Sequence, residues 1–361
     1  MVDDKHRWPK GPAGQAALAL GTVGVLGGLF VAFWPLGPDY YYTFRPVAQG
    51  CLKGVTHLYD AQSVGFYDAP WTVALFLPSA LLPLRYGQAL VLVGSLVGIL
   101  AALWAWGAGQ VRPARAALAL GTLHTLDLLL RGNVDGFLAL GLGLGWLGVR
   151  HRRAWLVGMG LWLLSVKPLN VLLAGLFFLR ALWAWTPRER WTALAPVGLS
   201  LGGSFFCAGW DWPLRYLHAL RAQPPYVALQ TSLWRGLVFW GMDPEMSQQI
   251  NWGVFLAALL VLGLWIRKVG SEDPLELALV TAANLAFSPY TLGSHYVLLA
   301  PVFLVVTEAL PPLRWAWGLT WTPLLRLVGG TSWAWVDGLY PWALFLGALY
   351  AVRQQKGAPQ G

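Results

Sequence analysis

Long apolar segments, separated by short polar breaks, follow one another along the whole chain. Most are close to the length of a helix that crosses a hydrocarbon core, which takes about 20 residues. The pattern therefore predicts a series of membrane-spanning helices. We expect these segments at about 16–36, 70–84, 88–108, 114–130, 134–149, 154–167, 168–185, 191–208, 251–267, 274–289, 295–311, 313–329 and 333–351.

Composition agrees with this prediction. Of the 361 residues, 57% are hydrophobic and 11% are charged, which is far from the usage of soluble domains. We expect an all-α polytopic membrane protein with one domain over 1–361 and no separate soluble domain. The segment at 16–36 is not followed by a small-residue cleavage site, so it predicts a retained helix.

Basic residues predict the orientation of the chain. They gather in the breaks between segments, and such clusters lie on the cytoplasmic side of membrane proteins. The same distribution accounts for the net charge of +9, so we expect no nucleic-acid partner. The clusters are "KHRWPK" at 5–10, Arg112 with Arg115, "RHRR" at 150–153, "RALWAWTPRER" at 180–190, "RK" at 267–268, Arg314, and Arg353 with Lys356.

Counting the crossings assigns a different role to one segment. If every segment crossed, the basic clusters at 112–115 and 150–153 would lie outside. The segment at 70–84 is short and contains internal prolines, so we expect it to lie along the outer face instead. About 12 spans then remain, with a range of about 11 to 13, and both predicted tails, 1–13 and 352–361, are cytoplasmic.

The same count places several polar stretches on the extracytoplasmic face. A first loop at 37–87 would carry juxtamembrane helices, and a second large loop would cover 209–250. Three shorter turns join them: "RGNVDG" at 131–136, "SVKP" at 165–168 and "SPYTLGSH" at 288–295.

Ionisable residues inside spans are candidates for function, because each costs about 2.5 to 3.5 kcal/mol on insertion. His124, Asp127 and Arg131 follow i, i+3, i+7 spacing and therefore share one helix face. For Asp127 we favour a structural ion pair with Arg131. Arg131 itself is more open to a functional role.

Lys167 stands alone in an apolar stretch, where Pro168 interrupts the helix. Irregular backbone at membrane depth usually lines a cavity or is buried in protein. A lysine that reaches to the interface explains the position equally well. His295 lies between two apolar segments on the outer face, where it could cap a helix, join interfacial aromatic residues or contact a substrate.

Other patterns have simpler explanations. The repeat "GLGLGWLG" at 141–148 lies inside an apolar helix with no strand before it, so helix packing explains it better than nucleotide binding. The six histidines lack metal-ligand spacing, and we expect no metal site. Cys51 and Cys207 would form a disulfide only if they were close together in an oxidising compartment, and the sequence leaves this open.

Six short blocks occur in order along the predicted outer face. Their order and spacing are similar to those of glycosyltransferase family 87, the polyprenyl-phosphate-mannose-dependent mannosyltransferases within the GT-C class of integral-membrane enzymes. The resemblance covers most of the chain and implies a GT-C-like helix bundle. The blocks are "PDYYYTFRPVAQGCLKGVTHLYDA", "FYDAPWTVALFLPSALLP", "RGNVDGFLAL", "SVKPLNVLL", "LQTSLWRGL" and "SPYTLGSHYVLLAP".

The resemblance implies that Asp39, the aspartate of the first loop, is the general base. An acceptor hydroxyl becomes a good nucleophile when a carboxylate takes its proton during attack. Cations aimed at the departing lipid phosphate would stabilise the transition state, so neither a metal nor another cofactor is expected. The residues implied for contact with the phosphate or the substrate are Lys167, His295, Arg131, Arg45, Tyr42 and Asn133.

The implied partners are a polyprenyl-phosphate sugar donor, with mannose as the first choice of sugar, a glycolipid or glycan acceptor, and the bilayer. The implied location is the plasma membrane, with the active site on its extracytoplasmic face. The chain departs from the family pattern at two places. A usual Tyr-Pro-Pro block reads Tyr67-Asp68-Ala69-Pro70, and a usual Gly-Gln reads Gly132-Asn133, which bears on the substrate more than on the reaction.

Two alternatives stay open. A secondary transporter could use Asp127, Arg131 and Lys167 as an ion or substrate pathway, and an inactive relative would have lost the chemistry. The gathering of polar residues at one face favours an enzyme, since a transporter needs a site near the midplane that both sides can reach. The presence of Asp39 argues against an inactive relative.

Overall fold

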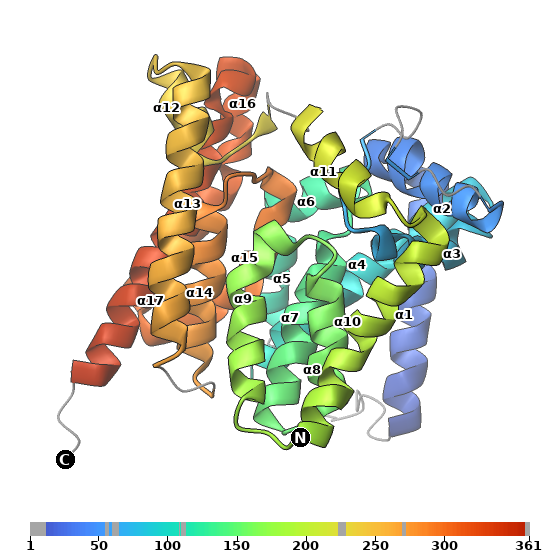
Figure 1. Ribbon diagram of the computed structural model, residues 1–361, viewed down its shortest axis with the longest axis horizontal. Helices are drawn as coiled ribbons and strands as arrows, with labels where there is room; N and C mark the ends of the chain where they lie inside the picture. Colours follow the sequence, from blue (N-terminus) through green and yellow to red (C-terminus); the bar gives the residue numbers. More distant parts are fainter. Residues whose placement is uncertain are drawn as a thin grey trace, which may run out of the picture.

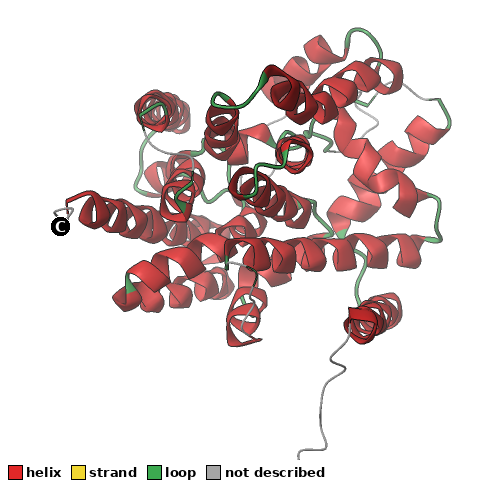
Figure 2. Ribbon diagram, turned by 90° about the horizontal axis from the view of Figure 1, so that it is seen from below, coloured by secondary structure: helices red, strands yellow, loops and turns green. Residues whose placement is uncertain are grey.

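Helices make up all the regular secondary structure in the described part of the chain (Figures 1 and 2). The computed structural model describes residues 12–54, 58–59, 65–107, 109, 113–222, 229–268 and 272–357. The helical content confirms the predicted all-α class. Arg112, the side chain of Cys207 and the outer parts of both predicted tails lie outside the described residues.

The helices fall into three groups by length and type. The longer α-helices are α1 (Pro12–Phe33), α4 (Leu84–Trp106), α7 (Asp135–Arg150), α8 (Ala154–Leu164), α9 (Pro168–Leu182), α10 (Pro187–Ala208), α13 (Pro244–Ile266), α14 (Pro274–Phe287), α15 (Leu299–Ala309) and α17 (Leu339–Gly357). The shorter or less apolar ones are α2 (Arg45–Leu52), α3 (Val73–Ala80), α5 (Pro113–Leu120), α6 (Leu123–Arg131), α11 (Trp212–Ala222), α12 (Leu233–Phe239) and α16 (Arg326–Gly329). A π-helical turn, η1 (Asp39–Phe44), and four 3₁₀ segments complete the set, namely η2 (Pro70–Thr72), η4 (Gly293–Leu298), η5 (Pro311–Leu325) and η6 (Gly330–Gly338).

Glycines allow the central helices to approach closely. A Cβ on Gly136 of α7 would lie 2.5 Å from Ser95 of α4, and one on Gly160 of α8 would lie 2.6 Å from Gly145 of α7. Such contacts between small residues are typical of helices packed in membranes. The structure thereby confirms that the repeat at 141–148 serves helix packing.

The outer surface of the bundle is apolar. α13 is exposed along most of its length, with Leu260 65% and Val261 64% exposed, and such a surface suits contact with lipid. By length and composition, α4 and α13 can each cross a membrane, and α6 with α7, bent by 118°, could form one further crossing in the described part of the chain. The expected count of about 12 spans stays a prediction.

Two predicted segments, at 114–130 and 70–84, form helices shorter than a membrane span. The segment at 114–130 is wrong as one helix, because the Thr122 side chain accepts a hydrogen bond from the Thr125 backbone N–H at 3.1 Å and caps the start of α6. The chain therefore forms α5 and α6 separately. In the segment at 70–84, α3 has 8 residues, which at about 1.5 Å per residue is too short to cross, as predicted.

The two ends of the bundle differ in chemistry. In Figure 1 the short helix α6 lies above α7, which begins at Asp135 and ends at Arg150. Arg115 forms a salt bridge with Glu308, near the end of α15. The short helices α2, α3, α6 and α11 cover the upper end (Figure 1). Arg150 and the polar turn before α7 therefore lie at opposite ends of that helix, although Arg131 and Arg326 lie beside the turn that carries His295.

Candidate active site

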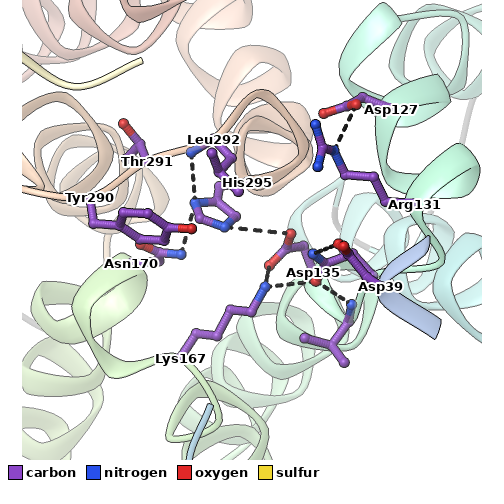
Figure 3. Close-up of polar contacts among 12 residues, drawn as sticks. Asp39, Asp127, Arg131, Asp135, Lys167, Asn170, Tyr290, Thr291, Leu292 and His295 are labelled. Atoms are coloured by element: carbon purple, nitrogen blue, oxygen red, sulfur yellow. Dashed lines mark hydrogen bonds and ion pairs between the residues drawn. The ribbon is translucent and has the colours of Figure 1, made fainter. Parts of the chain in front are cut away.

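A cavity of about 430 Å³ opens at the upper end of the bundle. Its walls come from η1, the segment before η2, the turn before α7, the start of α9, α11, α13 and the turn before η4. Four of the residues predicted from the sequence line it: Asp39, Asn133, Lys167 and His295. The fold thus joins four distant parts of the chain at one place (Figure 3).

Asp39 begins η1 and is 5% exposed. Asn133 donates a hydrogen bond from Nδ2 to Oδ2 of this carboxylate at 2.8 Å. Two glycines permit the approach: Gly132 ends α6 with φ +69°, and a Cβ on Gly37 would lie 2.5 Å from the Arg131 carbonyl oxygen. Close packing of these two backbone segments therefore holds the carboxylate against the amide.

The orientation of the Asn133 amide follows from its partners. Its Oδ1 accepts hydrogen bonds from Lys167 Nζ at 2.7 Å and from the Val134 backbone N–H at 2.6 Å. Because both partners can only donate, Nδ2 must face Asp39. Asn133 therefore links the carboxylate to the lysine.

Lys167 points into the protein. Pro168 starts α9 immediately after it, and its Nζ donates to Asp135 Oδ1 at 3.0 Å. The lysine side chain is 12% exposed and that of Asp135 is fully buried. An ammonium has three N–H donors, and two are used by Asn133 and Asp135, which leaves one for a ligand. The Lys167 side chain therefore turns toward Asn133 and Asp135 and not toward the outer surface of the protein.

His295 presents one ring nitrogen as a donor. Its Nδ1 accepts a hydrogen bond from the Leu292 backbone N–H at 3.1 Å and lies 3.0 Å from Asn170 Nδ2. Since a backbone N–H can only donate, the proton of the ring belongs on Nε2. Nε2 faces Asp135 Oδ2 at 3.9 Å (Figure 3), which is longer than a hydrogen bond.

Three residues of the site were not predicted. Asp135 lies two positions after Asn133, in a turn that the crossing count had already placed outside. Asn170 lies three positions after Lys167, in the first turn of α9. Asp68 stands at a departure from the family pattern. Each lies inside one of the six short blocks on the predicted outer face, and that position was the signal that could have identified it.

Asp68 lines the cavity beside Lys167 and is 8% exposed. Burial raises the pKa of its carboxyl to about 6, and the nearby carboxylates of Asp135 and Asp39 act in the same direction. The charge of Lys167 opposes this rise. The cavity therefore contains a carboxylate that is costly to ionise.

Acceptors outnumber cations around the cavity. Asp39 and Asp68 line it and Asp135 adjoins it, whereas Lys167 is the one lysine or arginine among the described lining residues. In the described part of the chain, no group of three or more His, Cys, Asp or Glu side chains is arranged to hold a metal ion. The arrangement suits a ligand with hydroxyl groups at one place and an anionic group near Lys167 and His295.

Three predicted residues lie away from the cavity lining. Arg131 Nε donates to Asp127 Oδ1 at 2.9 Å, which confirms the ion pair expected for Asp127. Arg45 donates to the Leu82 carbonyl at 2.8 Å and thereby ties α2 to the turn after α3. Tyr42 is 60% exposed. A direct role of Arg131, Arg45 or Tyr42 in substrate contact stays a prediction.

A second group of buried polar side chains, here called the neighbouring cluster, lies beside the cavity. Arg326 contacts Asp337 directly. A Cβ on Gly293 would lie 3.4 Å from Asp127 Oδ2 and 3.5 Å from Arg326 Nη2, so this group packs against the turn that carries His295. Its members are His124, Asp127, Arg131, Arg326 and Asp337.

The comparison with protein families agrees with this geometry. The family model described as glycosyltransferase family 87 matches residues 66–301, which is more than half of the chain. The matched range contains Asn133, Lys167 and His295 and begins after Asp39. Neither the curated proteins nor the solved structures gave a match. With its apolar helices and a polar cavity at one end, this chain belongs to glycosyltransferase family 87.

Proposed function

We propose that the protein is an inverting glycosyltransferase that moves a sugar, mannose in the first instance, from a polyprenyl-phosphate donor to a lipid or glycan acceptor. Asp39 is the general base. The observation that carries this proposal is the position of the Asp39 carboxylate, which is held by Asn133 in a cavity that also contains Lys167 and His295. A base and donors for a phosphate therefore share one space.

In the proposed reaction the acceptor hydroxyl attacks the anomeric carbon of the donor sugar. Asp39 takes the hydroxyl proton as the new carbon–oxygen bond forms. The bond between the anomeric carbon and the phosphate oxygen breaks, and its electron pair leaves with the polyprenyl phosphate. Attack from the face opposite the leaving group inverts the anomeric centre in a single step, as in inverting hydrolysis with a hydroxyl in place of water.

The leaving phosphate gains negative charge and needs donors that are already in position. Lys167 keeps one N–H beyond its bonds to Asn133 and Asp135, and His295 offers Nε2–H. In this proposal both donate to phosphate oxygens. Asp135 orients Lys167, and the Leu292 N–H fixes the histidine tautomer, so the donors need little rearrangement when the donor lipid arrives.

The proposed setting is the extracytoplasmic face of the cell membrane, with about 12 spans and cytoplasmic termini. Support comes from the two ends of the bundle. α7, α9 and α15 each begin beside the cavity, whereas basic residues such as Arg115 and Arg150 lie at the opposite end, as the positive-inside rule requires. A cavity at one end also supports an enzyme over a transporter, whose site lies near the midplane.

The test is a transfer assay with purified protein in detergent, polyprenyl-phosphate mannose and a pool of membrane glycolipids as acceptors. We expect Asp39→Asn to bind the donor but to lose about 10²- to 10⁴-fold in turnover, because the amide cannot take the proton. Asp211→Asn is the matched control, since Asp211 is exposed and pairs with Arg215 outside the cavity. Turnover by Asp39→Asn equal to that of the control would remove Asp39 from the mechanism.

A further inference from the structure

We propose that Asp68 binds hydroxyl groups of a pyranose ring in the cavity and so determines in part which sugar the enzyme accepts. This inference rests on the proposed glycosyl transfer. Three features of Asp68 support the inference: a fixed backbone, a carboxylate without a hydrogen-bond partner among the described residues, and two tyrosines that line the same cavity.

The backbone around Asp68 is held at both sides. Its carbonyl accepts a hydrogen bond from the Tyr59 hydroxyl at 2.9 Å. The N–H of Ala69 donates to the Val166 carbonyl at 3.2 Å, directly before Lys167. The carboxylate therefore starts from a fixed position next to the lysine that lies at the proposed phosphate end of the cavity.

The carboxylate itself has no hydrogen-bond partner among the described residues, although Asp68 is 8% exposed and lines the cavity. A buried carboxylate without a partner is costly, and such groups in native proteins usually serve a purpose. Lys167 is the cation whose charge acts on the pKa of Asp68, but its ammonium already donates to Asn133 and Asp135. A ligand that offers hydroxyl donors would satisfy the carboxylate.

Two tyrosines, Tyr67 and Tyr216, line the cavity together with Asp68. The rings of Tyr59 and Tyr216 lie 5.3 Å apart between centroids. A pyranose presents apolar C–H groups on its faces and hydroxyl donors at its edge. Flat rings beside an unsatisfied acceptor match both features.

The charge of the site selects among possible ligands. An anionic group placed against Asp68 itself would be repelled by that carboxylate, so the phosphate of the donor lies on the side of Lys167 and His295. Neutral hydroxyl groups avoid that repulsion, and a hydrogen bond to a charged acceptor is stronger than one between neutral groups. The sugar could be the transferred ring of the donor or a ring of the acceptor, and both present the same chemistry.

The experiment compares Asp68→Ala and Asp68→Asn with wild type and with Asp211→Asn as the control. The donors are short-chain polyprenyl-phosphate mannose and its 2-, 3-, 4- and 6-deoxy forms, with membrane glycolipids as the acceptor pool. Separate KM values for donor and acceptor identify which ring Asp68 contacts. Asp68→Asn keeps the side-chain volume, so it answers the question if the alanine variant fails to fold.

If Asp68 contacts the donor ring, Asp68→Ala should lower kcat/KM for the donor by about 10- to 100-fold. The donor that lacks the contacted hydroxyl should lower kcat/KM of the wild type by the same factor. That deoxy donor should cost Asp68→Ala nothing more, because the contact is already absent. If the acceptor ring is the partner, the acceptor KM rises instead while the donor KM is unchanged.

Two other results have distinct meanings. If wild type transfers mannose and both Asp68 variants stay within about twofold of the control for donor and acceptor alike, the inference about Asp68 is overturned while the proposed transfer stands. If wild type neither binds nor uses the polyprenyl-phosphate sugar, the proposed function fails, and the Asp68 assignment fails with it.

Discussion

Two buried groups of charged side chains lie close together at the upper end of the bundle, and they differ in how their charges are matched. In the neighbouring cluster each carboxylate contacts its own arginine, since Arg131 pairs with Asp127 and Arg326 contacts Asp337. Around the cavity, Asp135 contacts Lys167 directly, Asp39 is linked to the same lysine through Asn133, and the carboxylate of Asp68 lies near its charge. In the former group each carboxylate has its own cation, whereas the latter has more carboxylates than lysines or arginines among its described residues and lies at a cavity that can admit a ligand.

The difference shows that buried charge alone does not mark a site. Intramembrane ionisable residues are candidates for function, and both groups meet that criterion. The accessible space and the ratio of carboxylates to cations separate them, because the neighbouring cluster also leaves Asp127 Oδ2 and both ring nitrogens of His124 without a hydrogen-bond partner among the described residues. The neighbouring cluster instead packs against Gly293, two residues before His295, and so supports the turn from which the histidine reaches the cavity.

The largest expected effect comes from removing one cation in each group. Lys167→Met and Arg326→Met are well matched, because their side chains are 12% and 17% exposed and each faces a fully buried carboxylate. Both should lower the free energy of unfolding by about 3 to 5 kcal/mol, since a buried carboxylate loses its partner. Only Lys167→Met should also lower kcat per folded molecule, by about 10²- to 10³-fold.

Thermal unfolding in detergent and transfer assays normalised to folded protein distinguish the two outcomes. Equal loss of kcat in both variants would mean that the neighbouring cluster takes part in the chemistry. Full activity of folded Lys167→Met would mean that the lysine has only a structural role.

A smaller effect is expected from the backbone contact that holds Asp39. Gly37→Ala places a Cβ within 2.5 to 2.7 Å of three backbone atoms of Arg131 and Gly132, which should cost about 1 to 3 kcal/mol and displace the base. Gly198→Ala in α10 is the control, because its Cβ meets nothing within 4 Å. We expect Gly37→Ala to lose transfer activity and Gly198→Ala to keep it.

Transfer rates and donor binding should be measured for both glycine variants. Loss of turnover with donor binding retained would agree with a displaced base. Unchanged turnover in Gly37→Ala would show that the position of Asp39 tolerates this shift.

The smallest effect is a pH dependence of stability from Asp68. Its pKa is about 6 in the folded protein, against 3.8 as the ordinary value. Between these values the folded protein keeps a proton that the unfolded chain has lost, so this group makes the protein less stable as pH rises through the window. Asp68→Asn has no ionisable group at this position and therefore lacks this pH dependence. The effect in the wild type is small because Asp68 faces the cavity.

The measurement is the difference in melting temperature between Asp68→Asn and wild type from pH 4 to pH 8. The advantage of the variant should grow between about pH 4 and pH 6 and then stay constant. A difference that is the same at every pH would show that Asp68 ionises with its ordinary pKa and that burial does not raise it.

The prediction of the site from sequence was uneven for a physical reason. Asp39, Asn133, Lys167 and His295 lie in short blocks whose order is visible in one dimension, and the structure brings them to one cavity. Arg45 is one of the cations that the sequence places on the outer face. Its guanidinium instead binds a carbonyl after α3, since side-chain direction on a helix depends on rotation that spacing does not convey.

The site residues that the sequence did not predict become recognisable only through contacts between distant parts of the chain. Asp135 and Asn170 carry no distinctive signal in the sequence, although they lie close to the predicted site residues Asn133 and Lys167. Asp135 belongs to the site because Lys167, 32 positions away in the sequence, donates a hydrogen bond to it. Asn170 contacts His295, which is 125 positions away. Contacts over such separations depend on how the helices pack.

Sequence alone determined that the chain is helical and apolar, that its polar turns and basic clusters alternate, and that its blocks resemble one family. These properties follow from local composition and periodicity, which each segment carries by itself. Tertiary structure decided which charges are matched and which face the cavity, because Asp39 meets Asn133 only where Gly37 packs against Gly132. Close approach of two backbones is a property of the folded bundle, and it sets the geometry of the site.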